Sequence, residues 1–232
     1  MEKYFSFERF IKIVPVLASY LPVTLKEMGI VILLATAAGV LIALIRVYKV
    51  PVLSQFFQLY LLLMRGVPYM ILIMVVYYFL PFLAQKVTGV SINNWEKIVF
   101  AEITFVLHES AYIGEIIRGA VESVPKVQKE AAYTVGLNEI QTYFRIIRPQ
   151  SIKAAIPAYG ANFVEIFQNT AITYLIGVLD FMGAANSFGN SMHSSMETYT
   201  FAAIVYVTIS ILIEMIFKFL DSKYQFGVKT VV

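Results

Sequence analysis

Long apolar runs constrain this chain more than any other feature. Residues 28–45, 66–85 and 198–213 contain no charged side chain, and residues 154–178 contain only Glu165. Runs of roughly 18 or more apolar residues are typical of helices that cross a lipid bilayer. We therefore expect an all-α integral membrane protein with five transmembrane helices. The expected spans are about 24–47, 66–85, 97–118, 154–178 and 198–220.

The composition fits a membrane protein and argues against several other classes. Hydrophobic residues make up 59% of the chain and charged residues 14%, far from the mixture of a soluble domain. Without cysteine, disulfides and thiolate metal sites are excluded, and we expect no metal site. No Gly-x-x-x-x-Gly-Lys phosphate loop and no paired nucleophile and base occur, so we expect no catalytic residue and no cofactor in this chain. The net charge of +3 gives no sign of a nucleic-acid partner.

The two ends differ from the spans. The first residues are charged, with Glu2, Lys3 and Glu8 where a signal peptide would have an apolar core. Residues 1–23 instead predict a short amphipathic lead, interrupted by Pro15. A single transmembrane domain at 24–222 and a tail at 223–232 complete the expected organisation.

Basic residues predict the orientation of the chain in the membrane. Cytoplasmic segments carry an excess of Lys and Arg, and one set of alternate segments holds most of them here. Residues 179–199 contain no Lys or Arg, as expected of an outer loop. We expect the N-terminus and residues 1–23 outside, and the C-terminus inside, a bacterial cell membrane. The residues of the basic set are Arg46, Lys49, Arg65, Arg118, Lys126, Lys129, Arg145, Arg148, Lys153, Lys218, Lys223 and Lys229.

Two expected spans contain polar residues that would be costly in contact with lipid. In the third, His108, Tyr112 and Glu115 share one helical stripe, and Glu102 and Glu109 share a neighbouring one. For Glu115 we expect internal pairing with Arg118, whereas His108, Glu109 and Tyr112 are candidates for lining a pathway. In the fourth, the polar residues hold helices together or line a path for a zwitterionic solute. These residues of the fourth span are Asn162, Glu165, Gln168 and Asn169.

A break in the helical pattern precedes the second span. Arg65, Gly66 and Pro68 combine a helix-breaking pair with an arginine that favours the membrane interface. Two interpretations stay open, a structural elbow and a hinge between moving parts of the bundle. Residues 52–64 before it are apolar but too short to span, and we expect them to approach the bilayer obliquely.

Residues 123–150 predict a polar helix-turn-helix between two spans. Ser123 and Pro125 favour a helix start, Gly136 suits the left-handed position after a helix end, and Asn138 with Gln141 forms a capping box. The expected apolar stripe of the first helix is Val127, Ala131 and Val135, and Pro149 is expected to stop the second helix. Ala131 and Ala132 would offer a small surface to a partner. The alternative is a purely structural re-entrant loop.

The amino-acid sequence of this loop resembles that of the EAA loop in permease subunits of ABC importers. The resemblance rests on Glu130-Ala131-Ala132, on Gly136 after them and on the sequence Ile147-Arg148-Pro149-Gln150, and it extends over about residues 21–224. It departs at Val67, at Arg148 and at residues 168–171, where relatives usually have Thr, Leu and Lys-Asp-Thr-Ser. The similarity is to the polar amino-acid group, and residues 46–51 and 19–25 look most like its cystine members.

The resemblance implies a type I importer permease that couples to other subunits. A separate ATPase, carrying ATP and Mg²⁺, would bind Glu130, Ala131, Ala132 and Gly136. A second permease copy (the same chain or a close paralogue) and an extracytoplasmic binding protein would complete a carrier for a polar amino acid, with L-cystine as one expectation. Membrane lipid would surround it.

A rival hypothesis treats Glu102, His108, Glu109 and Glu165 as a relay in a proton- or cation-coupled secondary transporter or channel. Such proteins commonly show inverted repeats, and no repeat is visible in this sequence. A relay also leaves the helix-turn-helix unexplained, and a membrane scaffold would leave the buried charges unexplained.

Overall fold

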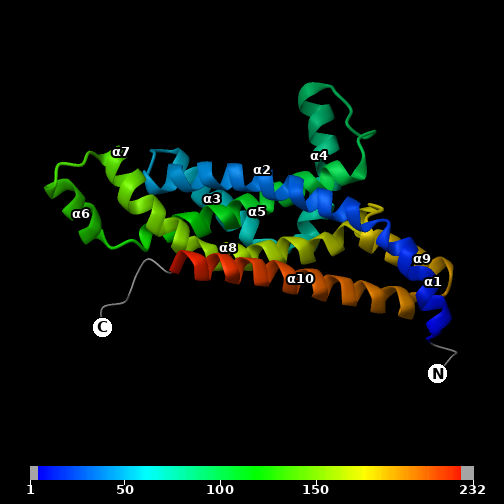
Figure 1. The fold of residues 1–232 in the computed structure, drawn as a ribbon. Helices are drawn as coiled ribbons and strands as arrows, with labels where there is room; N and C mark the ends of the chain where they lie inside the picture. Colours follow the sequence, from blue (N-terminus) through cyan, green and yellow to red (C-terminus); the bar gives the residue numbers. More distant parts are fainter. Residues whose placement is uncertain (1–4, 226–232) are drawn as a thin grey trace.

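The computed structural model describes residues 5–225, and these residues form a bundle of helices without strands (Figure 1). The elements are α1 (Phe7–Ala18), α2 (Leu21–Val47), α3 (Leu53–Gly66), α4 (Tyr69–Thr88), α5 (Lys97–Glu122), α6 (Lys126–Thr134), α7 (Glu139–Thr142), the π-helix η1 (Tyr143–Ile147), α8 (Arg148–Asn169), the 3₁₀-helix η2 (Thr170–Ile176), α9 (Phe181–Ser191) and α10 (Ser195–Gln225). The expected all-α fold is confirmed. The expected positions 1–4 and 226–232 of the lead and tail lie outside the described residues.

Three of the described helices are long and apolar enough to cross a membrane, namely α2, α4 and α10. The segments Glu139–Ile176 and Phe181–Ser191 together give a fourth candidate, bent by 48°. Helix α5 is also long, with 26 residues, but it carries the polar set of the expected third span. The count of five spans therefore stays a prediction.

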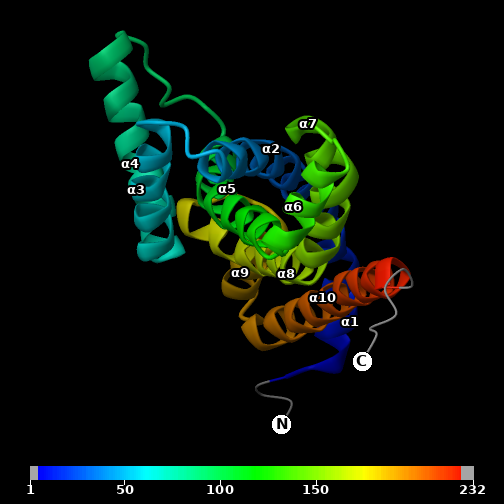
Figure 2. The same cartoon turned by 90° about the vertical axis from the view of Figure 1, so that its left-hand side faces the viewer.

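Helices α2, α5, α8 and α10 run alongside one another through the length of the bundle (Figures 1 and 2). Small residues allow α2 to approach α5 closely. A Cβ atom added to Gly39 would lie 2.8 Å from Ile113 Cγ2 and 3.0 Å from the backbone nitrogen of Gly114. Ala35, one turn earlier, is fully buried. The small-xxx-small pattern of Ala35 and Gly39 is thus a close helix contact.

The core lies where α2, α4, α5, α8 and η2 meet. Its largest fully buried side chains are Phe100 and Phe105 from α5, Phe167 from α8 and Ile73 from α4. Aromatic rings contribute the most apolar area per side chain, and this cluster fixes the first turns of α4 against the bundle.

Helices α1, α9 and one end of α10 pack together at one end of the bundle (Figure 1). Pro15 lies inside α1 and does not interrupt it, contrary to expectation. Its missing N–H deprives the carbonyl of Ile11 of a partner, and because Ile11 is 55% exposed, that carbonyl is near the helix surface. The expected outer loop 179–199 also differs, because it contains α9.

Asp180 attaches α9 to the start of α2. Its carboxylate accepts hydrogen bonds from Gly183 N at 2.8 Å, which begins the helix, and from Thr24 Oγ1 at 3.2 Å. Thr24 Oγ1 in turn accepts one from Phe181 N at 3.0 Å. Because Asp180 and Thr24 are fully buried, these bonds fix one end of the bundle.

The pair α3–α4 leaves the bundle. Helix α3 packs against α5 and α2, and α4 turns away after Val67, so that much of its length stands apart (Figures 1 and 2). The expected oblique approach of residues 52–64 to the bilayer stays a prediction. Several large apolar side chains of α4 are consequently exposed, among them Met70, Val75, Phe79 and Phe82. This face needs lipid or another chain to cover it.

Several helices begin or end at other residues than the expected spans. The second span begins at Tyr69 and not at residue 66, and the third continues to Glu122. The fourth is α-helical only to Asn169, where η2 takes over. Helix α10 begins at Ser195 and includes residues 223–225 of the expected tail.

Candidate functional site

The predicted helix-turn-helix stands at the end of the bundle away from α1 and α9 (Figure 1). Gly136 follows α6 with φ of 81°, the left-handed conformation that glycine adopts without strain. Asn138 Oδ1 accepts from Gln141 N at 2.9 Å, and Gln141 Oε1 accepts from Asn138 N at 3.1 Å. The predicted turn and capping box are thus present.

The residues of the Glu-Ala-Ala sequence differ in how exposed they are. Glu130 and Ala131 are exposed, whereas Ala132 is only 4% exposed and packs inward. The expectation that both alanines form the accessible surface is therefore wrong for Ala132. The outward apolar side chains are instead Val127 and Val135, exposed by 66% and 74%. Since these residues have little to cover them within the chain, the outer face of α6 is suited to a partner.

Two of the predicted boundaries of this loop are wrong. Ser123 ends α5, because its hydroxyl donates to the carbonyl of Ala120 at 2.7 Å, and it does not start α6. Pro149 does not stop the second helix, because α7 continues through η1 into α8. The wider π turn precedes Pro149, which then falls in the first turn of α8, where a missing N–H is tolerated.

A cleft of about 640 Å³ separates the loop from the ends of α2 and α5. Lys129 and Glu139 face it and form an ion pair at 3.5 Å. Lys129 also lies over the Tyr133 ring, and hydrogen bonding to Tyr133 raises the pKa of Lys129 above its usual value, aided by Glu139. These contacts hold α6 against α7 as one unit.

A buried polar network connects α5 to α8. The carboxylate of Glu109 meets His108 Nδ1 at 2.9 Å and accepts a hydrogen bond from Asn162 Nδ2 at 2.7 Å. Glu109 is fully buried, and His108 and Asn162 are 5% and 4% exposed. The rings of Tyr69 and Tyr112 lie on either side of the imidazole, with centroids 5.0 and 4.8 Å away.

The other polar residues of the expected pathway are not part of this network. Glu165 and Gln168 are exposed on α8, and Gln168 Nε2 donates to Ser210 Oγ of α10 at 3.4 Å. Asn169 is partly buried where the α-helix changes to η2. The stripe of the fourth span is therefore divided between a buried contact with α5 and an exposed face.

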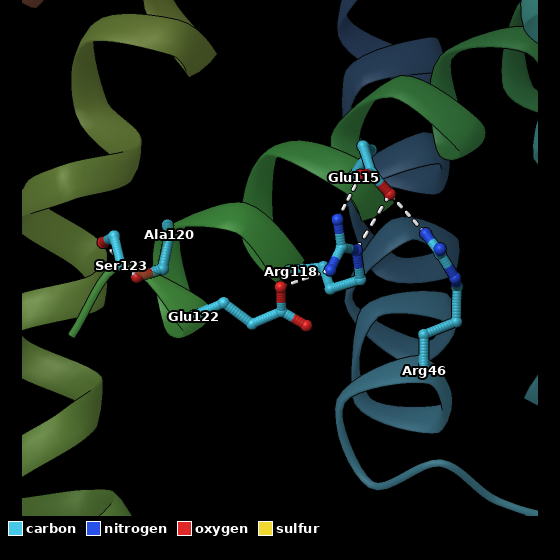
Figure 3. Close-up of polar contacts among 6 residues, drawn as sticks. All are labelled: Arg46, Glu115, Arg118, Ala120, Glu122 and Ser123. Atoms are coloured by element: carbon cyan, nitrogen blue, oxygen red, sulfur yellow. Dashed lines mark hydrogen bonds and ion pairs between the residues drawn. The ribbon is translucent and has the colours of Figure 1, made fainter. Parts of the chain in front are cut away.

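The predicted pairing of Glu115 with Arg118 is confirmed and extends further. Arg118 Nε donates to Glu115 Oε2 at 3.0 Å, and Arg118 also pairs with Glu122 (Figure 3). Arg46 of α2 binds the same Glu115 carboxylate, a contact that the sequence reasoning missed. The only indication of this contact in the sequence was that Arg46 and Glu115 carry opposite charges near the ends of two expected spans on the same side of the membrane.

The predicted break at Arg65, Gly66 and Pro68 is present. Helix α3 ends at Gly66, Val67 is extended, and Pro68 precedes α4. The Arg65 guanidinium lies over the Tyr112 ring, 5.3 Å from its centroid. The Arg65 side chain therefore brings the break into direct contact with Tyr112 of α5.

Sequence reasoning also missed Glu27 of α2. Its side chain is fully buried, and neither carboxylate oxygen has a hydrogen-bond partner among the described residues. A charged residue just before an uncharged run was the only signal. Among the described residues no group of three or more His, Asp or Glu side chains is arranged to hold a metal ion.

Comparison with known proteins matches residues 35–226 to the family described as "Binding-protein-dependent transport system inner membrane component". The chain is 33% identical to the L-cystine transport system permease protein TcyL of Bacillus subtilis (strain 168), covering 97% of this chain and 94% of that protein. It is 27% identical to the glutamate/aspartate import permease protein GltK of Escherichia coli O157:H7, covering 94% and 98%.

Two solved structures share the fold. A crystal structure of an amino acid ABC transporter with histidines aligns with a TM-score of 0.84 at 23% identity, over 94% of this chain and 99% of that one. The MetNI methionine ABC transporter in an inward-facing conformation aligns with a TM-score of 0.67 at 15% identity, over 95% and 99%.

Proposed function

The chain belongs to the family of inner membrane components of binding-protein-dependent transport systems, and we propose that it is the transmembrane subunit of an ATP-driven importer of a polar amino acid. L-cystine is the first candidate substrate, because the relative TcyL is named for it and aligns along almost the whole chain. The relative GltK is named for glutamate and aspartate. The class of substrate, a polar amino acid, therefore rests on both relatives, and the choice of L-cystine rests on TcyL.

The observation that carries the proposal is the exposed helix-turn-helix at one end of the bundle. Glu130, Ala131 and Gly136 are exposed there beside Val127 and Val135. An ATPase subunit would bind this surface and would itself carry ATP and Mg²⁺. The basic residues of the same side support a cytoplasmic location for it, and hence an external N-terminus and a cytoplasmic C-terminus in a bacterial cell membrane.

A second permease copy and an extracytoplasmic binding protein complete the proposed assembly. The apolar face of α4 stands clear of the bundle and is accessible to a second copy as well as to lipid. The binding protein would deliver the amino acid at the end formed by α1 and α9. Selectivity would then be divided between that protein and the permease.

The proposed pathway runs along α5 and α8. Glu109 binds Asn162 across the two helices, with His108 beside Glu109 and Tyr112 beside His108. Glu165, Gln168 and Asn169 would extend the polar surface along α8. A carboxylate in this surface would attract the ammonium group of the solute, and amides would bind its carboxylate.

The proposed coupling follows the covalent path of the chain. Closure of the ATPase dimer on ATP would displace α6 and α7, and α7 continues through η1 into α8. Asn162 of α8 would transmit the displacement to Glu109 of α5 through their hydrogen bond. The path would open outward with ATP bound and return inward after hydrolysis. The break at Gly66–Pro68 would act as the hinge.

The test compares Glu130→Arg and Gly136→Asp with the unaltered protein, each reconstituted with its ATPase and binding protein. We expect both variants to reach normal membrane levels but to lose substrate uptake and substrate-stimulated ATP hydrolysis together. Gly119→Asp is the matched control. Gly119 lies near the end of α5 that leads into the loop, a Cβ atom added there meets nothing within 4 Å, and its backbone is helical. Retention of both activities in the loop variants would contradict the proposal. Uptake abolished by an uncoupler but insensitive to vanadate would support the secondary-transporter rival.

A further inference from the structure

An amphipathic cleft lies between α2, α3 and α5. It meets the proposed pathway at Tyr112, the break at Gly66, and the cleft beside the coupling loop at Lys49 and Glu122. It consists of two adjoining hollows of about 680 and 360 Å³, which share Arg46, Gln55 and Gln58 in their walls. The larger hollow extends to Arg65 and Tyr112, and the smaller one to Lys49 in the turn between α2 and α3. The cleft therefore follows the cytoplasmic half of the bundle in the orientation proposed above.

The charges of this cleft are unbalanced. Figure 3 shows that Glu115 and Glu122 are already engaged by Arg46 and Arg118. Lys49 forms no ion pair with the described residues, and the described contact of the Arg65 side chain is the stacking on Tyr112. Two cations thus remain available to an anion, one in each hollow.

The backbone at the mouth of the cleft is strained. Lys49 and Val52 adopt φ angles of 49° and 65°, in the region that L residues avoid and that a β-branched valine avoids most. Such strain persists where the surrounding structure requires it and gathers at ligand sites. Here it shapes the turn from which Lys49 lines the smaller hollow.

Apolar side chains continue the cleft along α3. Leu59, Leu61 and Leu62 line the larger hollow, and Leu59 and Leu62 are 55% and 70% exposed. A small inorganic anion would gain no favourable contact from these apolar side chains. A ligand with a charged head and long apolar chains would match both parts of the cleft.

We propose that this cleft binds an anionic phospholipid of the cytoplasmic leaflet. The phosphate would be bound by Lys49 or Arg65 together with the amides of Gln55 and Gln58, and the acyl chains would lie against Leu59 and Leu62. Basic pockets between membrane helices on the cytoplasmic side are suited to anionic head groups. The bound lipid would hold α3 against α2 and α5 beside the break at Gly66–Pro68.

Lipid binding to the purified assembly tests this, with lipid counted by native mass spectrometry in detergent. The probes are phosphatidylglycerol and phosphatidylcholine with identical acyl chains, and inorganic phosphate. We expect phosphatidylglycerol to be retained in preference to phosphatidylcholine. Lys49→Gln and Arg65→Gln should each reduce that preference roughly five-fold, the effect of one cation near an anionic surface. The matched control is Lys223→Gln, an exposed lysine of α10 outside the cleft, which should change nothing.

Four results would overturn the proposal. Equal retention of the two lipids, or a preference that survives both cleft variants, would show that the cleft does not select an anionic head group. Competition by inorganic phosphate as effective as that by phosphatidylglycerol would assign it to a small anion. Loss of the permease dimer in the Lys49→Gln variant, without a change in lipid retention, would assign it to a second copy. None of these measurements uses transport, so a failure here is distinct from a failure of the proposed importer.

Discussion

Removing the amide that joins α8 to α5 tests whether the buried network connects the two helices energetically. Asn162→Ala deletes the donor that lies 2.7 Å from Glu109 Oε2 and leaves His108 as the remaining described partner of that carboxylate. Because Glu109 is fully buried, no solvent can replace the lost hydrogen bond. The variant should therefore lose stability for two reasons, an unpaired carboxylate oxygen and a small cavity.

A double-mutant cycle with Glu109→Leu, which removes the acceptor, separates these two reasons, since the cavity is common to both backgrounds. Hydrogen bonds to charged groups contribute about 1.5–3 kcal/mol in soluble proteins. Interhelical bonds in a membrane protein average about 0.6 and reach about 1.7 kcal/mol. We expect a coupling energy in the latter range, which corresponds to roughly a 3- to 18-fold change in the unfolding constant.

Unfolding in mixed micelles with increasing dodecyl sulfate measures the four free energies. Trp95, the single tryptophan, lies before α5 with its half-exposed ring 6.2 Å from that of the core residue Phe100, and it provides a fluorescence signal for unfolding beside the core. Gln168→Ala serves as the matched control, because this amide contacts Ser210 and should combine additively with Glu109→Leu. A coupling energy below about 0.3 kcal/mol for the Asn162 pair would refute the reasoning, because sites without contact are additive within that range.

Two further predictions concern the end of the bundle formed by α1 and α9. Gly183→Ala would place a Cβ atom 2.1 Å from the carbonyl oxygen of Val178, so we expect the yield of folded protein to collapse. Gly29→Ala is the control, because a Cβ atom there meets nothing within 4 Å, and it should raise stability by about 0.4–1 kcal/mol. Similar yields of the two variants would contradict this. Glu197→Gln removes the buried carboxylate that pairs with Arg9 at 3.0 Å, and we expect about 1–3 kcal/mol less protection of α1 amides in hydrogen exchange. Unchanged exchange in α1 would show that the pair does not hold this helix.

Local rules in the sequence predicted the parts of the site that depend on neighbouring residues. Gly136 and the pair Asn138–Gln141 are examples, because a helix end or start is decided by side chains within one turn. The same holds for Glu115 and Arg118, which are one turn apart. The expected break before Tyr69 followed from glycine and proline alone.

Contacts between distant residues were beyond such rules. Glu109 and Asn162 are 53 positions apart, and Arg46 and Glu115 are 69 apart, so each pair becomes visible only when the helices are packed. The stripe containing Asn162 indicated polarity, but it did not indicate which members face α5. The burial of Ala132 has the same origin.

Helix continuity was misjudged at both ends of α8: Pro149 was expected to stop a helix and does not, and the span expected to reach residue 178 changes to a 3₁₀-helix at Thr170. Pro149 is accommodated after a π turn, and nearby carbonyls of Ile146 and Ile147 accept hydrogen bonds from the Gln150 and Ser151 side chains. At the other end of α8, the Thr170 hydroxyl donates to the carbonyl of Phe167 at 2.7 Å as the helix tightens into η2. These side-chain bonds stabilise geometries that backbone propensity alone does not favour.

The uninterrupted course from Glu139 to Asn169 has a geometric consequence. At about 1.5 Å per residue this stretch is roughly 45 Å long, so a tilt of about 5° at one end displaces the other by about 4 Å. Such a rod converts a small angular change into a translation of atomic size without any change in its own internal hydrogen bonds. The wide turn at Tyr143–Ile147 and the position of Pro157, which offers no N–H to the carbonyl of Lys153, are places where the stiffness of the rod differs along its length.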